Sequence, residues 1–315
     1  MILAEGDKFM ETVTIMSRQD QLPLKASVFV PEGEIKGIIQ LVHGMAEHRF
    51  RYEPFMKELA ANGFVAIMHD HRGHGESVLD AKDWGYFYEN GAESIVEDTY
   101  QVTCYIKERF EDQPLILFGH SMGSLVVRAY AKRYDNEIDG LIVCGSPSEN
   151  KAAGMGKALA GLIGVFCGQR HRSKLLQHIA FGSYNKGLSD TVSENSWLTT
   201  RKDVVAEYDN DPACGYIFTI NGFKNLFTLM QNVYDTNGWL MQNRELPILF
   251  LSGEDDPCAA GKQNFNHAVQ LMKDCGYAHV DSTLYPNKRH EILNEQDCET
   301  VYQDVIDWIY HILQL

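Results

Sequence analysis

Three features are scarce or missing in this sequence of 315 residues. No run of about 18 uninterrupted apolar residues occurs, so we expect no membrane-spanning helix. Residues 1–11 carry acidic side chains and no apolar run, so we expect no signal peptide. Lys and Arg number 28 against 43 Asp and Glu, and the net charge is −15. This charge argues against nucleic-acid partners and against electrostatic docking to anionic membranes.

Paired cysteines are also missing. The seven cysteines are scattered, odd in number and free of any C-x-x-C pair. This pattern is typical of reduced thiols in a cytoplasmic protein. No spacing of His and Cys resembles a zinc site, so we expect no metal.

Apolar runs alternate with helical segments along most of the chain. Strands are expected at residues 12–17, 25–30, 37–42, 64–68, 115–118, 141–144, 247–251 and 280–285, and helices at residues 52–62, 94–110, 124–134, 261–273 and 301–313. Strands that are apolar on both faces predict an α/β fold with a mainly parallel sheet covered by helices on both sides. A ligand of such a sheet lies beyond the carboxyl ends of the strands.

The alternation breaks between about residues 148 and 246. This stretch begins with a Gly-rich apolar helix at residues 152–168, and it continues with a basic patch and with aromatic residues on irregular segments. We therefore expect a core of residues 1–147 and 247–315, with residues 148–246 inserted as a helical cap on the ligand side. An apolar cap helix of this kind is also compatible with a transient lipid contact.

The strand at residues 115–118 leads directly into Gly119-His120-Ser121-Met122-Gly123, and a helical segment follows. Strand, G-x-S-x-G and helix together are typical of a nucleophile elbow, which predicts Ser121 as a nucleophile. A side chain at Gly119 or Gly123 would crowd the neighbouring backbone of this turn.

A serine nucleophile needs a base and a carboxylate that orients the base. In this architecture the chain order is Ser, acid, His. His290 is the only histidine in the loop after the last strand, so we predict it as the base. Asp256 is the favoured acid because it lies before Pro257 at the apex of a turn, with Asp255 as the alternative.

The developing oxyanion needs two N–H donors. The Met122 N–H directly follows the nucleophile. The second donor is expected from the loop after the strand at residues 37–42, where we choose the Met45 N–H.

Several motifs together resemble the monoacylglycerol lipase and lysophospholipase branch of the α/β-hydrolases, the serine aminopeptidase-like family of bacterial type. They are H-G-M-A-E-H at residues 43–48, D-H-R-G-H-G-E-S at residues 70–77, the elbow at residues 119–123, and the acid and base turns at residues 253–257 and 289–291. The resemblance implies a cofactor-free serine ester hydrolase that acts on medium or long acyl chains. It also supports Met45, Met122 and Asp256 in the roles given above.

We therefore expect hydrolysis of monoacylglycerol-like or lysophospholipid-like esters, which are small-molecule substrates. The apolar cap residues expected to receive the acyl chain are Leu159, Leu162, Ile163, Phe166 and Phe181. A short-chain carboxylesterase is one alternative. An aminopeptidase or amidase is another, and it would need a carboxylate such as Glu194, Glu207 or Asp209 to hold the substrate amine. A non-hydrolytic ligand-binding protein of the same fold is the third.

Overall fold

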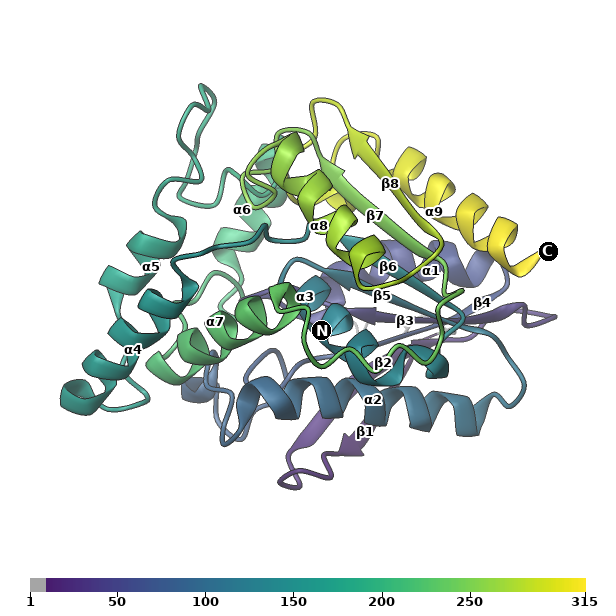
Figure 1. Ribbon diagram of the computed structural model, residues 1–315, viewed down its shortest axis with the longest axis horizontal. Helices are drawn as coiled ribbons and strands as arrows, with labels where there is room; N and C mark the ends of the chain where they lie inside the picture. The colour runs from purple at the N-terminus through teal and green to yellow at the C-terminus, as the bar shows by residue number, and fades with distance from the viewer. Residues whose placement is uncertain (1–9) are drawn as a thin grey trace, which may run out of the picture.

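The computed structural model describes residues 10–315 and is built around one eight-stranded sheet (Figure 1). The strand order is β1-β2-β4-β3-β5-β6-β7-β8; β1, β2 and β4 pair antiparallel, and all other pairs are parallel. The strands are β1 (Met10–Met16), β2 (Pro23–Phe29), β3 (Gly37–Val42), β4 (Phe64–His69), β5 (Leu115–His120), β6 (Gly140–Cys144), β7 (Ile248–Gly253) and β8 (Val280–Tyr285). The predicted α/β sheet is confirmed. The expectation about a signal peptide falls almost entirely on residues 1–9, which lie outside the described residues.

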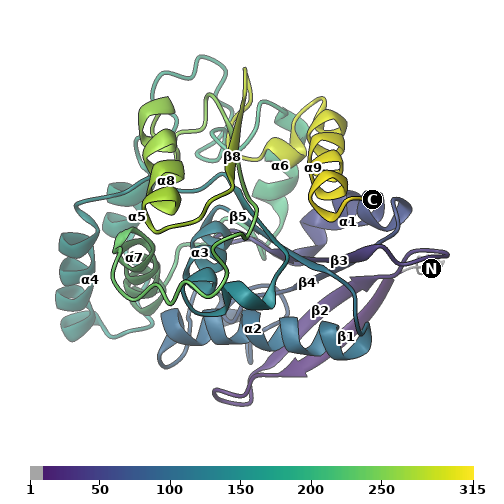
Figure 2. The same ribbon diagram turned by 45° about the vertical axis from the view of Figure 1, so that its right-hand side comes forward.

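Helices cover both faces of the sheet (Figures 1 and 2). One face carries α1 (Glu53–Ala61) and α9 (Cys298–Leu313), and the other carries α2 (Gly91–Arg109), α3 (Met122–Tyr134) and α8 (Lys262–Asp274). Ile38 and Ile39 are neighbours in β3, yet they belong to two different apolar cores because successive strand residues face opposite sides. Continuous apolar strands therefore serve two cores at once.

The register of the parallel strands brings their carboxyl ends to one edge. Val42 of β3 lies beside Gly119 of β5, and His120 lies beside Cys144 of β6. Gly253 of β7 lies beside Tyr285 of β8. The loops that follow these strands carry the predicted oxyanion, nucleophile, acid and base residues, so the sheet assembles all four at one edge.

Residues 148–246, called here the inserted segment, separate β6 from β7. They contain α4 (Ala153–Cys167), α5 (Lys174–Phe181), α6 (Lys202–Asn210) and α7 (Ile220–Tyr234). The expectation of irregular structure after α4 was right for residues 182–201 and wrong for residues 220–234, where α7 is a capped and buried helix. The Thr219 hydroxyl accepts a hydrogen bond from the Gly222 N–H at 3.1 Å, and Phe223 and Val233 face the core. Helix α7 packs against α4, α3 and α2, which fixes part of the inserted segment to the sheet layer.

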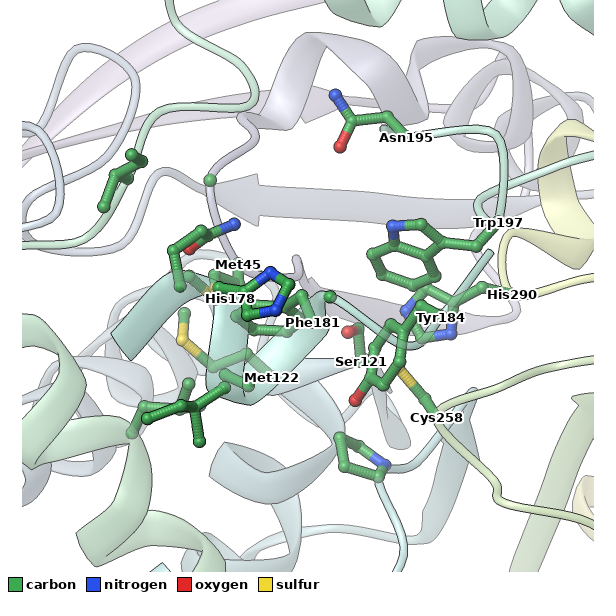
Figure 3. Close-up of a pocket in the computed structure, with 18 of the residues that line it drawn as sticks. Met45, Ser121, Met122, His178, Phe181, Tyr184, Asn195, Trp197, Cys258 and His290 are labelled. Carbon is green, nitrogen blue, oxygen red and sulfur yellow. The ribbon is translucent and has the colours of Figure 1, made fainter. Parts of the chain in front are cut away.

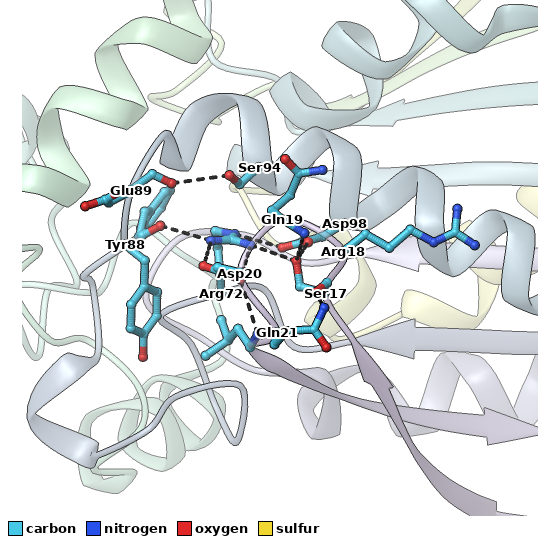
Figure 4. A network of polar contacts seen from close by, with 12 residues as sticks. Ser17, Arg18, Gln19, Asp20, Gln21, Arg72, Tyr88, Glu89, Ser94 and Asp98 are labelled. Atoms are coloured by element: carbon cyan, nitrogen blue, oxygen red, sulfur yellow. Dashed lines mark hydrogen bonds and ion pairs between the residues drawn. The ribbon is translucent and has the colours of Figure 1, made fainter.

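The D-H-R-G-H-G-E-S loop after β4 is held by the buried Arg72 (Figure 4). Its guanidinium donates to Asp98 of α2 at 2.8 Å and to Asp20 in the β1–β2 turn at 2.9 Å. The His71 N–H donates to His43 Nε2 at 2.9 Å. The loop thus braces the backbone that leads into the predicted oxyanion loop.

No helix within residues 10–315 is both long enough and apolar enough to cross a bilayer.

Candidate active site

Ser121 occupies a strained turn between β5 and α3. Its backbone has φ 54° and ψ −119°, a conformation that residues other than glycine rarely adopt. A Cβ on Gly123 would lie 2.1 Å from the carbonyl oxygen of Val42, and one on Gly119 would lie 2.5 Å from that of Gly123. Both glycines are therefore required for α3 to start this close to β3 and β5.

His290 and Asp256 form a buried pair. His290 Nδ1 lies 3.0 Å from both carboxylate oxygens of Asp256. The carboxylate also accepts hydrogen bonds from the Cys258 N–H at 2.8 Å and the Ser252 hydroxyl at 3.1 Å. The alternative acid, Asp255, is exposed. With its proton on Nδ1, His290 keeps Nε2 free as the basic nitrogen.

The pair shifts both pKa values in the direction that an ion pair requires. Burial opposes ionisation of Asp256, but the adjacent His290 and the two hydrogen bonds outweigh it and hold the pKa of this carboxyl below its ordinary value. Burial likewise opposes the charged imidazole, yet the carboxylate of Asp256 raises the pKa of His290 above its ordinary value. The site therefore stabilises an imidazolium opposite a carboxylate.

The predicted oxyanion loop lies directly against the nucleophile. A Cβ on Gly44 would lie 3.1 Å from Ser121 Cβ. Ala46 has φ 53°, and its carbonyl accepts hydrogen bonds from the Tyr208 hydroxyl and the Gly215 N–H, each at 2.9 Å. The inserted segment thus fixes the loop that carries Met45.

Met45 and Met122 both line the cavity in front of Ser121 (Figure 3). Met122 is the first residue of α3, so its N–H is among the amides that a helix start leaves without an intrahelical partner.

The largely buried guanidinium of Arg51 joins the oxyanion loop to the base loop. Arg51 donates to Glu47 at 2.5 Å and, through two bonds of 2.7 Å, to Glu291, the residue after His290. Glu47 in turn accepts the Gly44 N–H at 2.6 Å and the Tyr52 hydroxyl at 2.9 Å. Burial opposes ionisation of both carboxyls, but Arg51 helps to hold their pKa values below the ordinary range. Sequence reasoning assigned no role to Arg51, although Arg51-Tyr52 follows the oxyanion motif.

A cavity of about 950 Å³ opens in front of Ser121 and His290. Leu159 of α4 and Phe181 of α5 line it, as expected of acyl-binding residues. Leu162 and Phe166 do not line the cavity. They lie on the outer side of α4, where they are 59% and 81% exposed. Ile163 packs against the apolar core and is also absent from the lining. The prediction for these three residues was wrong.

Sequence reasoning missed two aromatic residues near the base, Trp197 and Tyr184. The ring centroid of Trp197 lies 4.9 Å from that of His290, and the ring of Tyr184 lies 4.9 Å from that of Trp197 (Figure 3). They lie at residues 182–201, between α5 and α6, where the sequence has no helical or strand periodicity that would point to a buried position. Of the three carboxylates considered for amine binding, Glu194 lines the cavity, whereas Glu207 and Asp209 do not.

Two groups of residues have the donor atoms to hold a metal within the described part of the chain. One is Asp256, Cys258 and His290, which overlaps the acid–base pair. The other is His48, Asp211 and Cys214, where His48 Nε2 already bonds Asp211 at 2.8 Å. The charge of Arg51 acts on both Asp211 and Cys214, which disfavours a cation at this second group.

Known proteins resemble this chain over most of its length. The model of the family described as "Serine aminopeptidase, S33" matches residues 33–297. A monoacylglycerol lipase from Mycolicibacterium smegmatis is 28% identical over 290 residues, which cover 90% of this chain and 91% of that protein. A monoglyceride lipase from Saccharomyces cerevisiae is 25% identical, covering 88% and 85%. The solved structure of a thermostable carboxyl esterase from Bacillus coagulans, in complex with glycerol, superposes with a TM-score of 0.90 at 25% identity, covering 98% and 100%.

Proposed function

Because this chain belongs to the serine aminopeptidase, S33, family of hydrolases, we propose that it cleaves monoacylglycerol-like or lysophospholipid-like esters through an acyl-enzyme. The fold is the α/β-hydrolase fold. The observation that carries the proposal is the shared cavity. It brings Ser121, on its strained elbow, together with His290, whose Nδ1 bonds Asp256, in front of apolar walls large enough for an acyl chain.

The reaction begins with attack of Ser121 Oγ on the ester carbonyl while His290 Nε2 takes the hydroxyl proton. Asp256 holds the imidazole tautomer and stabilises the imidazolium that forms. The N–H groups of Met45 and Met122 bind the oxyanion. His290 then gives its proton to the leaving alcohol, and water hydrolyses the acyl-enzyme with the same base.

The acyl chain lies along the apolar wall formed by α4 and α7, so residues 148–246 act as a cap. Leu159 of α4 lines this wall together with Leu226, Phe227 and Met230 of α7. A cavity of about 950 Å³ is at the upper end of the range for ligand pockets, which supports a medium or long chain.

The test is hydrolysis of 4-nitrophenyl esters with two to sixteen carbons, with Ser121→Ala alongside. We expect the rate to peak at eight carbons or more and to vanish in the variant. Activity on acetate and butyrate alone would favour the short-chain carboxylesterase. Turnover of aminoacyl-naphthylamides in place of esters would favour an aminopeptidase, with Glu194 as the amine-binding carboxylate. No turnover of any of these compounds would favour a ligand-binding protein.

We further propose a transient contact of α4 and α5 with lipid. Val165 and Phe166 of α4 are 79% and 81% exposed, and Ile179 of α5 is 58% exposed. Exposed side chains of this size support docking to an apolar or zwitterionic surface.

We also propose a cytoplasmic location, because all seven cysteines are free. Activity that fractionates with a secreted or periplasmic fraction would contradict it.

A further inference from the structure

Four histidine side chains are packed together, without exposed surface, beside the predicted oxyanion loop. They are His43, His69, His71 and His74, called here the histidine cluster. The ring centroid of His43 lies 4.4 Å from that of His71 and 5.3 Å from that of His74, and the ring centroids of His69 and His71 are 5.1 Å apart. His43 begins the oxyanion loop, and the other three lie at the end of β4 and in the loop at residues 70–77. The cluster therefore joins these two loops.

The hydrogen bonds of His43 require its neutral form. Its Nδ1–H donates to the Gly44 carbonyl at 2.8 Å, and its Nε2 accepts the His71 N–H at 2.9 Å. The His71 Nε2–H in turn donates to the His43 carbonyl at 3.1 Å. A second proton on His43 would be bound to Nε2, where it would face the His71 N–H. Protonation of His43 therefore breaks a hydrogen bond that joins the two loops.

The other three rings have buried nitrogens that have no acceptor for an added hydrogen. His71 Nδ1, His74 Nε2 and both ring nitrogens of His69 have no hydrogen-bond partner within residues 10–315. A buried imidazolium whose second N–H lacks an acceptor is costly, so these rings are stable here only as neutral imidazoles. The cluster is also absent from the groups in the described chain whose donor atoms converge as a metal site requires.

The carboxylates that face the cluster are already paired with arginines. Asp70 and Glu47 are the two whose negative charge acts on His43. Asp70 forms an ion pair with the buried Arg49, and Glu47 forms one with Arg51 at 2.5 Å. Neither carboxylate is therefore free to become the partner of an imidazolium.

The remaining neighbours do not favour a positive charge either. A charge on His48 would oppose one on His43, and the members of the cluster oppose one another in the same way. Three aromatic rings pack against His74, namely those of Phe87, Tyr216 and Phe218. Burial lowers the pKa of every member of the cluster, to about 3 for His69 and His74. At neutral pH the folded cluster therefore carries no charge.

We propose that the histidine cluster is an acid-sensitive junction, in which protonation of the imidazoles releases the loops at residues 43–48 and 70–77 from each other. Once the loops separate, each imidazole reaches water and regains the ordinary pKa of 6.5. The open state then binds protons that the closed state cannot bind. The closed state is therefore fully stabilised above about pH 6.5 and loses stability as the pH falls, by up to about tenfold in the opening equilibrium per pH unit for each histidine.

The test is amide hydrogen exchange of the full-length protein, followed by mass spectrometry at pH 7.0 and pH 5.0 and corrected for the intrinsic pH dependence of exchange. We expect the protection factors of the two loops to fall at least about 100-fold between these pH values. Those of α9, which contains no member of the cluster, should change by less than about threefold. Titration of His290 lowers the rate of ester hydrolysis without opening the loops, so exchange tests the cluster independently of the proposed activity.

Two variants remove one titrating group without breaking a hydrogen bond, because neither ring nitrogen of His69 has a partner in the described chain. In His69→Leu the fall in protection should be about tenfold smaller than in the wild type. His69→Gln, which is polar but does not titrate, should give the same result and serves if the leucine variant does not fold. His311→Gln, at an exposed position of α9, is the matched control and should keep the wild-type fall.

Three results would overturn the inference. They are unchanged protection of the loops at pH 5.0, a fall of equal size in α9, and a wild-type fall in a folded His69 variant. Loss of ester hydrolysis with any of these exchange patterns would bear on the proposed function alone.

Discussion

At the scale of single residues, His290 is the group whose protonation controls the proposed reaction. Its imidazole must be neutral to accept the proton of Ser121, and Asp256 raises its pKa above the ordinary value despite burial. We therefore expect kcat/KM to fall on the acid side, with a midpoint above pH 6.5, the ordinary pKa of histidine.

Asp256→Asn removes the charge that raises this pKa, so the acid midpoint should move to lower pH. The rate at neutral pH should fall by up to about 10⁴-fold, because the amide no longer enforces the correct tautomer. A pH–rate profile of both proteins with 4-nitrophenyl laurate checks both effects. An unchanged midpoint in the variant would mean that Asp256 does not set the charge state of the base.

Arg51 is the residue whose loss should affect both loops of the site. Arg51→Met leaves Glu47 and Glu291 buried without their cation, and breaking a buried pair in this way costs about 3–5 kcal/mol of stability. We expect a lower thermal midpoint and a fall in kcat that exceeds the change in KM, because the loops position the oxyanion donors and the base rather than the substrate.

Arg51→Lys retains the charge but cannot make the paired bonds to Glu291, so it should recover part of the stability and less of kcat. A variant that loses stability while keeping kcat at a temperature where it is folded would show that Arg51 supports the fold alone.

Sequence reasoning identified some site residues correctly and missed or misplaced others, for physical reasons. Ser121 and His290 follow strand ends, which are marked by apolar runs, and the resemblance favoured Asp256 over Asp255. Arg51 remained without a role because its partner Glu291 is 240 positions away in the chain. Phe166 was misplaced because α4 is apolar on all sides, so periodicity does not reveal which side faces the cavity.

At the scale of elements, the core helices and strands were predictable and those of the inserted segment were less so. The strand at residues 37–42 has the predicted bounds, because a buried parallel strand is a short apolar run between turns. The edge strand at residues 280–285 also has the predicted bounds, although only its end residues, Val280 and Tyr285, are buried. Helix α7 was not predicted from the sequence. It packs against α2, α3 and α4, and these tertiary contacts cannot be read from the sequence of the segment itself.

The exposed apolar side chains of α4 can be tested for lipid contact. Replacing Val165 and Phe166 by Glu makes the outer face of α4 polar without touching the cavity. We expect the double variant to hydrolyse a monomeric short ester at the wild-type rate and to bind zwitterionic vesicles several-fold less tightly, measured by co-sedimentation. Gly161→Ser, on the same helix and with open space around it, is the matched control. Equal vesicle binding by all three proteins would exclude this face as the lipid contact.

At the scale of the whole molecule, the net charge of −15 opposes any approach to a negative surface. Vesicle binding should therefore weaken as anionic lipid is added and recover in part as salt rises, because the Debye length shortens from about 10 Å at 0.1 M salt to about 3 Å at 1 M. Binding that strengthens with anionic lipid would mean that a local basic surface, and not the apolar face, governs the contact.

The bonds between residues 196–201 and the loop around His290 also bear on how such an enzyme can diversify. Arg289, Glu291 and Glu295 hold the backbone of Ser196, Leu198 and Thr200, so the segment beside the substrate and the loop that performs the chemistry share one set of anchors. An inserted segment exchanged between two relatives would arrive without the groups to which Arg289, Glu291 and Glu295 bond. We therefore expect substitutions within this segment to preserve the geometry around His290 better than replacement of the whole segment.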